Sequence, residues 1–348
     1  MGTNETNNFL VSALSRSSPN HVMRAQALNY HKKMLTENSF KATDFPILTR
    51  LQLLLQKLGE FDNAISARLL LLEITELKKI DKFKIKIDNL MQPGSVMKLY
   101  PTIRTKNEAR TVHSITQFLE ILQGKPRFAL LQKLHFSSNP IYNDVHGKRI
   151  AIVGPSAATV NRGQEIDEYD LVVRINIKSD KSLPNPVSHG SRTDVIYLNG
   201  MWSDRFKSQN YSTLLSSGCH FVWRHRNVKH KVVSHHYLTN VSNIEISGSL
   251  LMFPNVLIDL LRFQPASIDV FYTDFYTGKK IYEGNYESEK NAKMIWDLAG
   301  HDLLTNINLI NFILAKSKTI VKFSDLVIGE TSLDLNKFTS LMKKNRRS

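Results

Sequence analysis

One segment of 27 residues, IAIVGPSAATVNRGQEIDEYDLVVRIN, restricts the fold of this chain more than any other part of its sequence. It begins with a short apolar strand, Ile150–Val153, and continues into a turn of small residues, Gly154–Ala158. A polar stretch follows, and then a second apolar strand, Leu171–Val173. Strand, small-residue turn, helix and second strand is the order in which an open α/β sheet forms a nucleotide site at the carboxyl ends of its strands.

Further apolar runs continue this pattern along the chain. We expect strands at Asp194–Leu198, Phe221–Trp223 and Ile268–Phe271, and helices at Leu250–Arg262 and Leu303–Ala315. Strands that alternate with helices form a mostly parallel sheet that is covered by helices on both faces. The predicted fold class is therefore α/β: a Rossmann-like, open, mostly parallel sheet preceded by a small all-helical domain.

The sequence predicts four parts along the chain. Residues 1–20 are rich in Ser, Asn and Thr and are expected to form a disordered tail. Residues 21–140 have few Gly or Pro in their first half and are expected to form the helical domain. Residues 141–330 are expected to form the α/β domain, and residues 331–348 a basic C-terminal tail.

The helical part contains one pattern that is typical of a repeat. Leu58–Glu73 has the L-G-x-[YF]-x-x-A-I spacing of a tetratricopeptide helix pair, in which Gly59 would allow close packing of the helices. A stable array needs about three such units, and one is clear here. A small helical domain and a degenerate tetratricopeptide-like hairpin both stay open. Either would offer a surface for a protein partner.

Composition limits the compartment. The longest apolar stretch, Ser249–Phe263, is broken by Pro254 and Asp259, whereas a membrane span needs about 20 mostly apolar residues. The N-terminus lacks a basic leader before an apolar core, so no signal peptide is predicted. Cys219 is the single cysteine, which excludes an intramolecular disulfide and favours a reducing compartment. We expect a cytoplasmic protein, or one held peripherally at the inner face of a membrane.

The chain is strongly basic, with a formal net charge of +15 and a pI of about 9.7. This charge favours an anionic partner, such as an acidic membrane surface, a nucleic acid or a phosphorylated substrate. The sequence has no zinc-ligand spacing, no RNP-type aromatic pattern and no recognition helix, so we expect no specific nucleic-acid binding.

Three short strings occur in a fixed order: V-G-x-S at Val153–Ser156, E-I-D-x-x-D-x-V-x-R-x-N at Glu165–Asn176, and G-S-x-T-D at Gly190–Asp194. Together they resemble the large sialylmotif of glycosyltransferase family 29, the sialyltransferases. The resemblance covers roughly residues 148–320 and implies a GT-A-like variant of the sheet. Because the chain has a single cysteine and no predicted anchor, it resembles a soluble, bacterial-style member of that family.

The resemblance also implies an activity. A sialyltransferase moves an acidic sugar of the sialic-acid type from a cytidine monophosphate (CMP) donor to a hydroxyl of an acceptor, with inversion. The CMP-activated sugar would be the donor, a glycan or lipid-linked glycan the acceptor, and no further cofactor is expected. The sequence has no Asp-x-Asp triplet of the kind that holds Mg²⁺ or Mn²⁺ for diphosphate donors, so we predict no metal site.

Six residues are expected to contact the donor: Gly154, Ser156, Arg174, Asn176, Ser191 and Asn199. The small residues after the first strand would let backbone N–H groups approach a phosphate. Asn176 is the strongest candidate, because it follows a strand at the edge where open α/β sheets bind ligands. For Arg174, an ion pair with Asp167 or Asp170 is an open alternative to ligand contact. For Ser156, the open alternative is a turn-forming role.

His301 is the predicted catalytic base. It comes just before a periodic run, and the dipole at a helix N-terminus disfavours an imidazolium ion, so the ring would accept a proton near neutral pH. Its position resembles the very small sialylmotif, H-x-x-x-x-E, whose histidine is the family's base. A simple helix-capping role stays open. Weaker site candidates are Ser247, Gly248, Asn255 and Asn306.

Two residues depart from the family pattern. Asn306 stands where the very small motif has glutamate, and Pro155 stands where the family usually has an asparagine that touches the nucleotide. Proline also removes a backbone donor. These departures favour an alternative hypothesis: a catalytically inactive binding or assembly protein with a nucleotide-sugar fold and a helical interaction domain.

Overall fold

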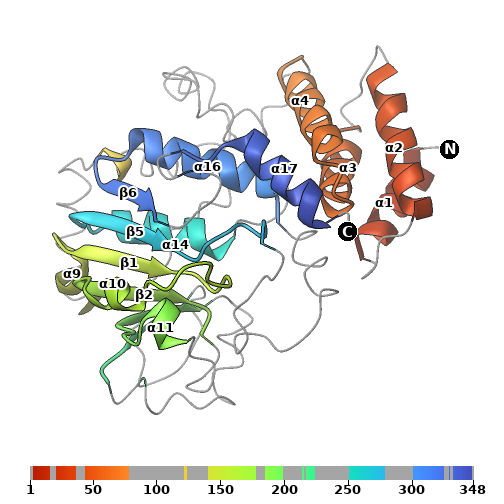
Figure 1. Cartoon of the computed structure of the whole chain (residues 1–348). Coiled ribbons are helices and arrows are strands. Elements are labelled where there is room, and N and C mark those ends of the chain that lie inside the picture. The colour runs from red at the N-terminus through yellow and green to blue at the C-terminus, as the bar shows by residue number, and fades with distance from the viewer. Residues whose placement is uncertain are drawn as a thin grey trace, which may run out of the picture.

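The computed structural model describes residues 3–15, 21–36, 44–77, 121–123, 140–177, 185–198, 214, 217–223, 251–278, 301–324, 329 and 332–346. At its centre lies an open sheet of six strands in the order β4-β3-β2-β1-β5-β6, and all five pairings between neighbours are parallel (Figure 1). The strands are β1 (Arg149–Val153), β2 (Leu171–Ile175), β3 (Val195–Leu198), β4 (His220–Trp223), β5 (Ser267–Phe271) and β6 (Ile320–Phe323). The predicted α/β class is confirmed.

Five of these strands were predicted, and β6 was missed. In β6 the side chains of Val321 and Phe323 are buried, whereas those of Ile320 and Lys322 are exposed. A four-residue edge strand with a lysine in it gives only a weak period-2 signal. The central strands β1 to β3 are buried along almost their whole length, which is why they appear as continuous apolar runs.

The order of the strands reverses at β1. Strands β2, β3 and β4 are added in chain order on one side of β1, and β5 and β6 on the other. In open parallel sheets, ligands bind outside the carboxyl ends of the strands at such a switch point. The loops after β1 and β5 therefore mark the place where a ligand site is expected.

Helices cover both faces of the sheet (Figure 1). On one face, α14 (Met252–Leu261) and α16 (Leu303–Lys316) pack on side chains that include Ile150 and Ile152 of β1. On the other face, the short helix α10 (Gly163–Asp167) contributes Ile166 to a cluster with the alternate side chains of the same strand. Both long helices were predicted from their apolar periodicity. A further short helix, α9 (Pro140–Val145), precedes β1.

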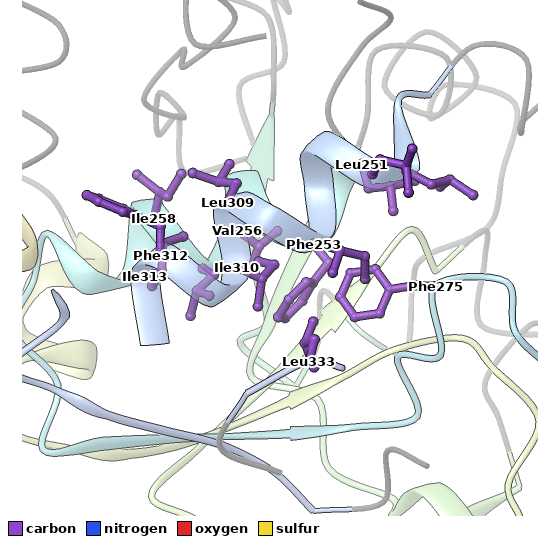
Figure 2. Packing of buried hydrophobic residues seen from close by; sticks show 14 of the residues in the cluster. Leu251, Phe253, Val256, Ile258, Phe275, Leu309, Ile310, Phe312, Ile313 and Leu333 are labelled. Atoms are coloured by element: carbon purple, nitrogen blue, oxygen red, sulfur yellow. The ribbon is translucent and has the colours of Figure 1, made fainter. Parts of the chain in front are cut away.

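The core between α14, α16 and the sheet also holds the loop after β5 (Figure 2). Phe275 of this loop is buried against Phe253 of α14, with ring centroids 5.8 Å apart and nearly perpendicular planes. Phe323 of β6 packs on the same Phe253 ring at 5.6 Å. Edge-to-face packing of this kind is favourable beyond the apolar area it buries. The carboxyl end of β5 is thus anchored in the main core.

The N-terminal region consists of helices α1 (Thr3–Ser15), α2 (His21–Thr36), α3 (Asp44–Lys57) and α4 (Phe61–Leu77). Residues 3–15 were expected to belong to a disordered tail but are helical, because Leu10 and Ala13 are buried in the main apolar cluster. The ammonium group of Lys57 donates to the carbonyl oxygens of Ala13 and Leu14, at 3.2 and 2.9 Å. These bonds satisfy carbonyl groups at the end of α1.

The turn between α3 and α4 explains the glycine of the repeat-like pattern. The backbone N–H of Glu60 donates to Leu55 O at 2.8 Å and that of Gly59 to Gln56 O at 3.0 Å, which is a Schellman ending. Gly59 has a φ of 73°, a conformation that glycine adopts without strain. Gly59 therefore ends helix α3, and Phe61 and Ala64 of the same pattern are buried.

The C-terminal segment is also more ordered than expected. Residues 335–346, predicted to belong to a basic tail, form helix α17 (Leu335–Arg346), which buries Phe338 and Met342. The Phe338 ring meets that of Phe61 in α4 edge to face, with centroids 5.7 Å apart. One apolar cluster runs from the N-terminal helices through α16 to α17. The division into a helical and an α/β domain stays a prediction.

No helix in the described ranges is long and apolar enough to span a membrane.

The single cysteine leads to a test of the fold. Cys219 precedes β4 and is buried, and its burial, with a smaller effect of the nearby Asp194 carboxylate, raises the pKa of its thiol to about 12. At pH 8 about one thiol in 10⁴ would be ionised in the folded protein. We expect iodoacetamide to label Cys219 very slowly in the folded protein and rapidly in 6 M guanidinium, as followed by mass spectrometry. Equal rates in both states would contradict the placement of β4.

Candidate functional site

The loops after β1 and β5 are joined at the switch point of the sheet. The backbone N–H of Gly154 donates to Phe271 O at 2.8 Å, and that of Ser156 donates to Tyr272 O at 3.0 Å. The hydroxyl of Ser156 donates to the carboxylate of Asp274 at 2.8 Å. The Ser156 hydroxyl also accepts from the Asp274 N–H at 3.3 Å, so backbone and side-chain bonds together fix the small-residue turn against its neighbour.

Gly154 is required by this close approach. A Cβ atom at this position would lie 2.2 Å from Tyr272 O and 2.4 Å from the side-chain oxygen of Thr273. Any larger residue would push the two loops apart. The predicted low bulk of the turn is confirmed, whereas contact between Gly154 and a donor stays a prediction.

Asp274 is a site residue that sequence reasoning missed. Its two carboxylate oxygens accept hydrogen bonds from the backbone N–H groups of Tyr276 and Gly278, both at 2.9 Å, in addition to the Ser156 hydroxyl. The carboxylate therefore organises the loop after β5 and orients Ser156. The only signal in the sequence was an acidic residue three positions beyond an apolar strand, which is too common to identify a site.

Backbone strain is concentrated at the same edge. Tyr272, Phe275 and Tyr276 have φ values of 50°, 51° and 66°, in a left-handed region that such side chains rarely adopt. Each costs about 1–3 kcal/mol and persists only where surrounding contacts enforce it. Here those contacts include the buried Phe275 ring and the turn around Asp274. The loop is held in one shape at the position where a ligand would bind.

Asn176 lies where the sequence placed it, directly after β2. It also adopts a left-handed conformation, with a φ of 58°, which asparagine tolerates better than most residues. Its backbone N–H donates to Tyr197 O of β3 at 2.7 Å. Asn176 is half-buried at the same sheet edge as the Ser156 loop, and its contact with a donor stays a prediction.

Arg174 supports the fold. Its side chain is 1% exposed, and the guanidinium donates to the backbone oxygens of His189 and Gly190, both at 2.9 Å. It also donates to the hydroxyl of Thr193 at 2.8 Å. Burial and these bonds give Arg174 a structural role, and a donor contact stays a prediction. The guanidinium thus bonds to backbone and hydroxyl oxygen atoms, and its charge also acts on the carboxylate of Asp167.

Ser191 is held in a similar way. Its backbone N–H and its hydroxyl both donate to the Asp167 carboxylate, at 2.8 and 2.7 Å, and the Arg192 N–H donates to the other oxygen at 2.9 Å. Partial burial alone would raise the pKa of Asp167, but these hydrogen bonds and the charge of Arg174 outweigh it and lower the pKa below its ordinary value. Ser191 thus closes the loop before β3, and a donor contact stays a prediction.

Two further acidic residues of the ordered strings lie at the amino ends of strands. Asp170 accepts a hydrogen bond from the Arg149 N–H at 2.8 Å, and Asp194 accepts one from the Val172 N–H at 2.7 Å. Each carboxylate therefore joins the start of one strand to its neighbour. These residues lie opposite to the edge where open α/β sheets bind ligands, and they fix the alignment of β1, β2 and β3.

His301 lies at the carboxyl edge. It immediately precedes Asp302, the N-cap of α16, whose carboxylate accepts from the Thr305 N–H at 3.1 Å. Since α16 connects the parallel strands β5 and β6, it runs back across the sheet and its N-terminus lies at the carboxyl edge. The predicted helix start is confirmed, and the catalytic role of His301 stays a prediction.

Asn306 and Asn255 are structural. Asn306 is 0% exposed; its side-chain oxygen accepts from the Leu251 N–H at 2.8 Å and its amide donates to Asp302 O at 2.7 Å. Asn255 is also buried and donates to Leu251 O at 2.9 Å. The bond between Leu251 and Asn306 holds the N-termini of α14 and α16 together, and the Asn255 bond lies within the first turn of α14. Both amides are buried and bonded within the fold, and a ligand contact for either stays a prediction.

His189, which sequence reasoning also missed, is bonded to the backbone of the Ser156 loop. It ends the short helix α11 (Pro186–His189) and is fully buried, with its ring centroid 4.1 Å from that of Tyr272. Its Nε2 lies 3.0 Å from Ser156 O, and its Nδ1 lies 2.8 Å from the Ser188 hydroxyl. Since a carbonyl oxygen only accepts, Nε2 carries a proton.

Three predicted site residues, Asn199, Ser247 and Gly248, lie outside the described residues. Within the part of the chain that the structure describes, there is no group of three or more His, Cys, Asp or Glu side chains that could hold a metal ion.

Comparisons with known proteins show a distant structural likeness. No protein-family model and no curated protein matches the chain. The structure is similar to the crystal structure of a mammalian sialyltransferase, with a TM-score of 0.33 and 12% identity over 61% of this chain and 85% of that one. The same coverage and identity, with a TM-score of 0.32, apply to a mammalian sialyltransferase in complex with Gal-beta-1-3GalNAc-ortho-nitrophenol.

The hydrogen bonds of Asp167 make a prediction that depends on pH. A carboxyl whose pKa is lowered by folding stabilises the protein above its ordinary pKa of 3.8, and this stabilisation is lost as the pH falls through the folded value. We expect Asp167→Asn to lower the free energy of unfolding by about 2 kcal/mol at pH 7, as is typical for hydrogen bonds to a charged group. Urea denaturation should show a smaller difference below pH 3.8. A difference that stays constant with pH would contradict a role for the charge.

Proposed function

We propose that this protein is an inverting, metal-independent glycosyltransferase of the sialyltransferase type, which transfers an acidic sugar from a CMP donor to a hydroxyl of a glycan. The observation that carries the proposal is the junction of the loops after β1 and β5, in which Ser156 is bonded to Asp274. This junction lies at the switch point of the sheet, where open α/β folds bind nucleotides. The three ordered strings between Val153 and Asp194 support the sialyltransferase type, because they resemble the large sialylmotif.

The small-residue turn is the proposed phosphate site. The N–H groups of Gly154 and Ser156 already donate to Phe271 O and Tyr272 O, so the CMP phosphate would be approached by backbone N–H groups later in the turn. The Ser156 hydroxyl already donates to Asp274, and it would contact phosphate only by exchanging that bond. Asn176 at the end of β2 is the proposed contact to the cytidine ribose, because its amide can both donate and accept.

His301 is the proposed general base. The acceptor hydroxyl would lose its proton to the imidazole while its oxygen forms a bond to the anomeric carbon of the sugar. The bond from that carbon to the CMP phosphate oxygen would break, with inversion at the carbon. The N-terminal position of His301 on α16 favours a neutral ring that can accept this proton. A monophosphate leaving group does not require a divalent metal.

The acceptor and the location of the protein belong to the same proposal. A glycan or lipid-linked glycan is the proposed acceptor. The net charge of +15 favours a protein that lies peripherally at an acidic inner membrane surface, in the cytoplasm. The N-terminal helices offer a surface for a protein partner.

The runner-up is a binding or assembly protein that has the nucleotide-sugar fold without catalysis. It is favoured by Asn306, which stands at the glutamate position of the very small motif and is buried between α14 and α16. It is also favoured by Pro155, which contributes no backbone donor to the proposed phosphate site.

Nucleotide binding tests the proposed site. We expect calorimetry to detect binding of CMP without added metal, and no binding of UDP, GDP or S-adenosylmethionine. Asn176→Ala should weaken CMP binding by about tenfold, the effect of one lost hydrogen bond in a buried site. Asn29→Ala, at an exposed position on α2, is the control and should bind CMP like the parent. A preference for UDP with Mn²⁺ would contradict the proposed metal-independent use of a CMP donor.

Substitution of the proposed base separates the two functions. With CMP-sialic acid and a panel of glycan acceptors, His301→Gln should lower turnover at least about 100-fold, because general-base catalysis contributes a factor of this size. Its affinity for CMP and its unfolding midpoint should stay near those of the parent. A parent protein that binds CMP but transfers no sugar to any acceptor would favour the binding protein.

A further inference from the structure

A buried polar network joins the N-terminal helices to the start of α16. Asp302 and Arg68 of α4 are 1% and 4% exposed, and the Arg68 guanidinium donates to one carboxylate oxygen of Asp302 at 3.1 Å. Gln52 of α3 donates to the other oxygen at 3.1 Å. The N-cap of a helix in the sheet-covering layer is thus bound by side chains that lie more than 230 positions earlier in the sequence.

The same helices also satisfy backbone groups in the first turn of α16. The side-chain oxygen of Gln56 accepts from the Leu303 N–H at 3.1 Å, and its amide lies 3.4 Å from the Asp302 carboxylate. Arg68 donates to the hydroxyl of Thr305, which in turn donates to Asp302. The first N–H groups of a helix have no partner within it, so these contacts determine where α16 begins.

We propose that the hairpin formed by α3 and α4 is part of the reaction centre, and that Arg68 and Gln56 are positioning residues that act through Asp302 on His301. This inference rests on the proposed function, in which His301 is the base. His301 is bonded to Asp302 through the chain, and the backbone of Asp302 is fixed by the contacts of its side chain. A shift or rotation of the cap would therefore move the imidazole directly.

The composition of the network agrees with a positioning role. Burial of an ion pair has a large desolvation cost. Apolar residues of similar size would therefore pack these helices together with equal or greater stability. Charged and amide groups add directional bonds that define one geometry. Small displacements matter in a reaction site, where an error of about 1 Å can cost about 100-fold in rate.

Two mild substitutions test the proposal in the full-length protein. Gln56→Met removes the bond to Leu303 N and keeps the volume, and Arg68→Lys keeps the charge but loses the planar contact to Asp302 and Thr305. We expect each to lower kcat by about tenfold or more while the donor KM and the CMP affinity change less than about twofold. The imidazole signals of His301 in ¹³C-histidine NMR spectra, assigned by their loss in His301→Gln, should shift.

The control removes a different ion pair of the helical region. Arg24 of α2 pairs with Glu60 at the turn between α3 and α4, and neither side chain belongs to the Asp302 network. Arg24→Met should leave kcat and the His301 signals unchanged. The signals of His146, which precedes β1 at the opposite edge of the sheet, should stay fixed in every variant.

The outcomes distinguish this inference from the proposed function. Unchanged His301 signals in both Gln56→Met and Arg68→Lys would overturn the positioning role, whatever the activity. His301 signals that shift in these variants, in a protein whose turnover survives His301→Gln, would support the positioning of His301 and overturn its assignment as the base.

Discussion

The buried carboxylate of Asp302 is the contact on which the arrangement of the molecule depends most. It accepts hydrogen bonds from α3, from α4 and from the first turn of its own helix. It thereby fixes the N-terminus of α16 at the carboxyl edge of the sheet. The backbone oxygen of the same residue accepts from the Asn306 amide, whose oxygen binds the N-terminus of α14. A carboxylate that is almost inaccessible to water needs all these donors, because an unpaired buried charge is strongly destabilising. This carboxylate therefore links the N-terminal helices to the layer that covers the sheet.

The polar residues of the ordered strings divide into two sets with different tasks. Asp167, Asp170, Arg174 and Asp194 satisfy backbone groups around the central strands and hold the loop before β3. Ser156 and Asn176 follow strands at the edge where ligands bind. The first, larger set stabilises the central strands and their loops. The second set, Ser156 and Asn176, belongs to the candidate site. A string that resembles an enzyme family can thus be explained largely by the needs of the fold.

Prediction from the sequence succeeded where burial was uniform. The strands β1 to β5 and the helices α14 and α16 appear as apolar runs of the right length and period. It failed at the edge strand β6 and at the two terminal helices, where a few apolar side chains such as Leu10 and Phe338 meet a distant surface. For the candidate site, it singled out Gly154, Ser156 and Asn176, which lie at the carboxyl edge of the sheet, but it missed Asp274 and His189. Those two acquire their roles from contacts with residues 118 and 33 positions away.

By itself, the sequence determined the class of the fold, the loop after β1 and the start of α16, because local apolar periodicity, small residues and capping residues act over a few positions. Only the tertiary structure decided that Arg174, Asn255 and Asn306 are buried, and that α3 and α4 hold the cap of α16. Whether a polar side chain faces a ligand or a backbone group depends on what the fold places opposite it. That neighbour comes from a distant part of the chain, and no local pattern records it.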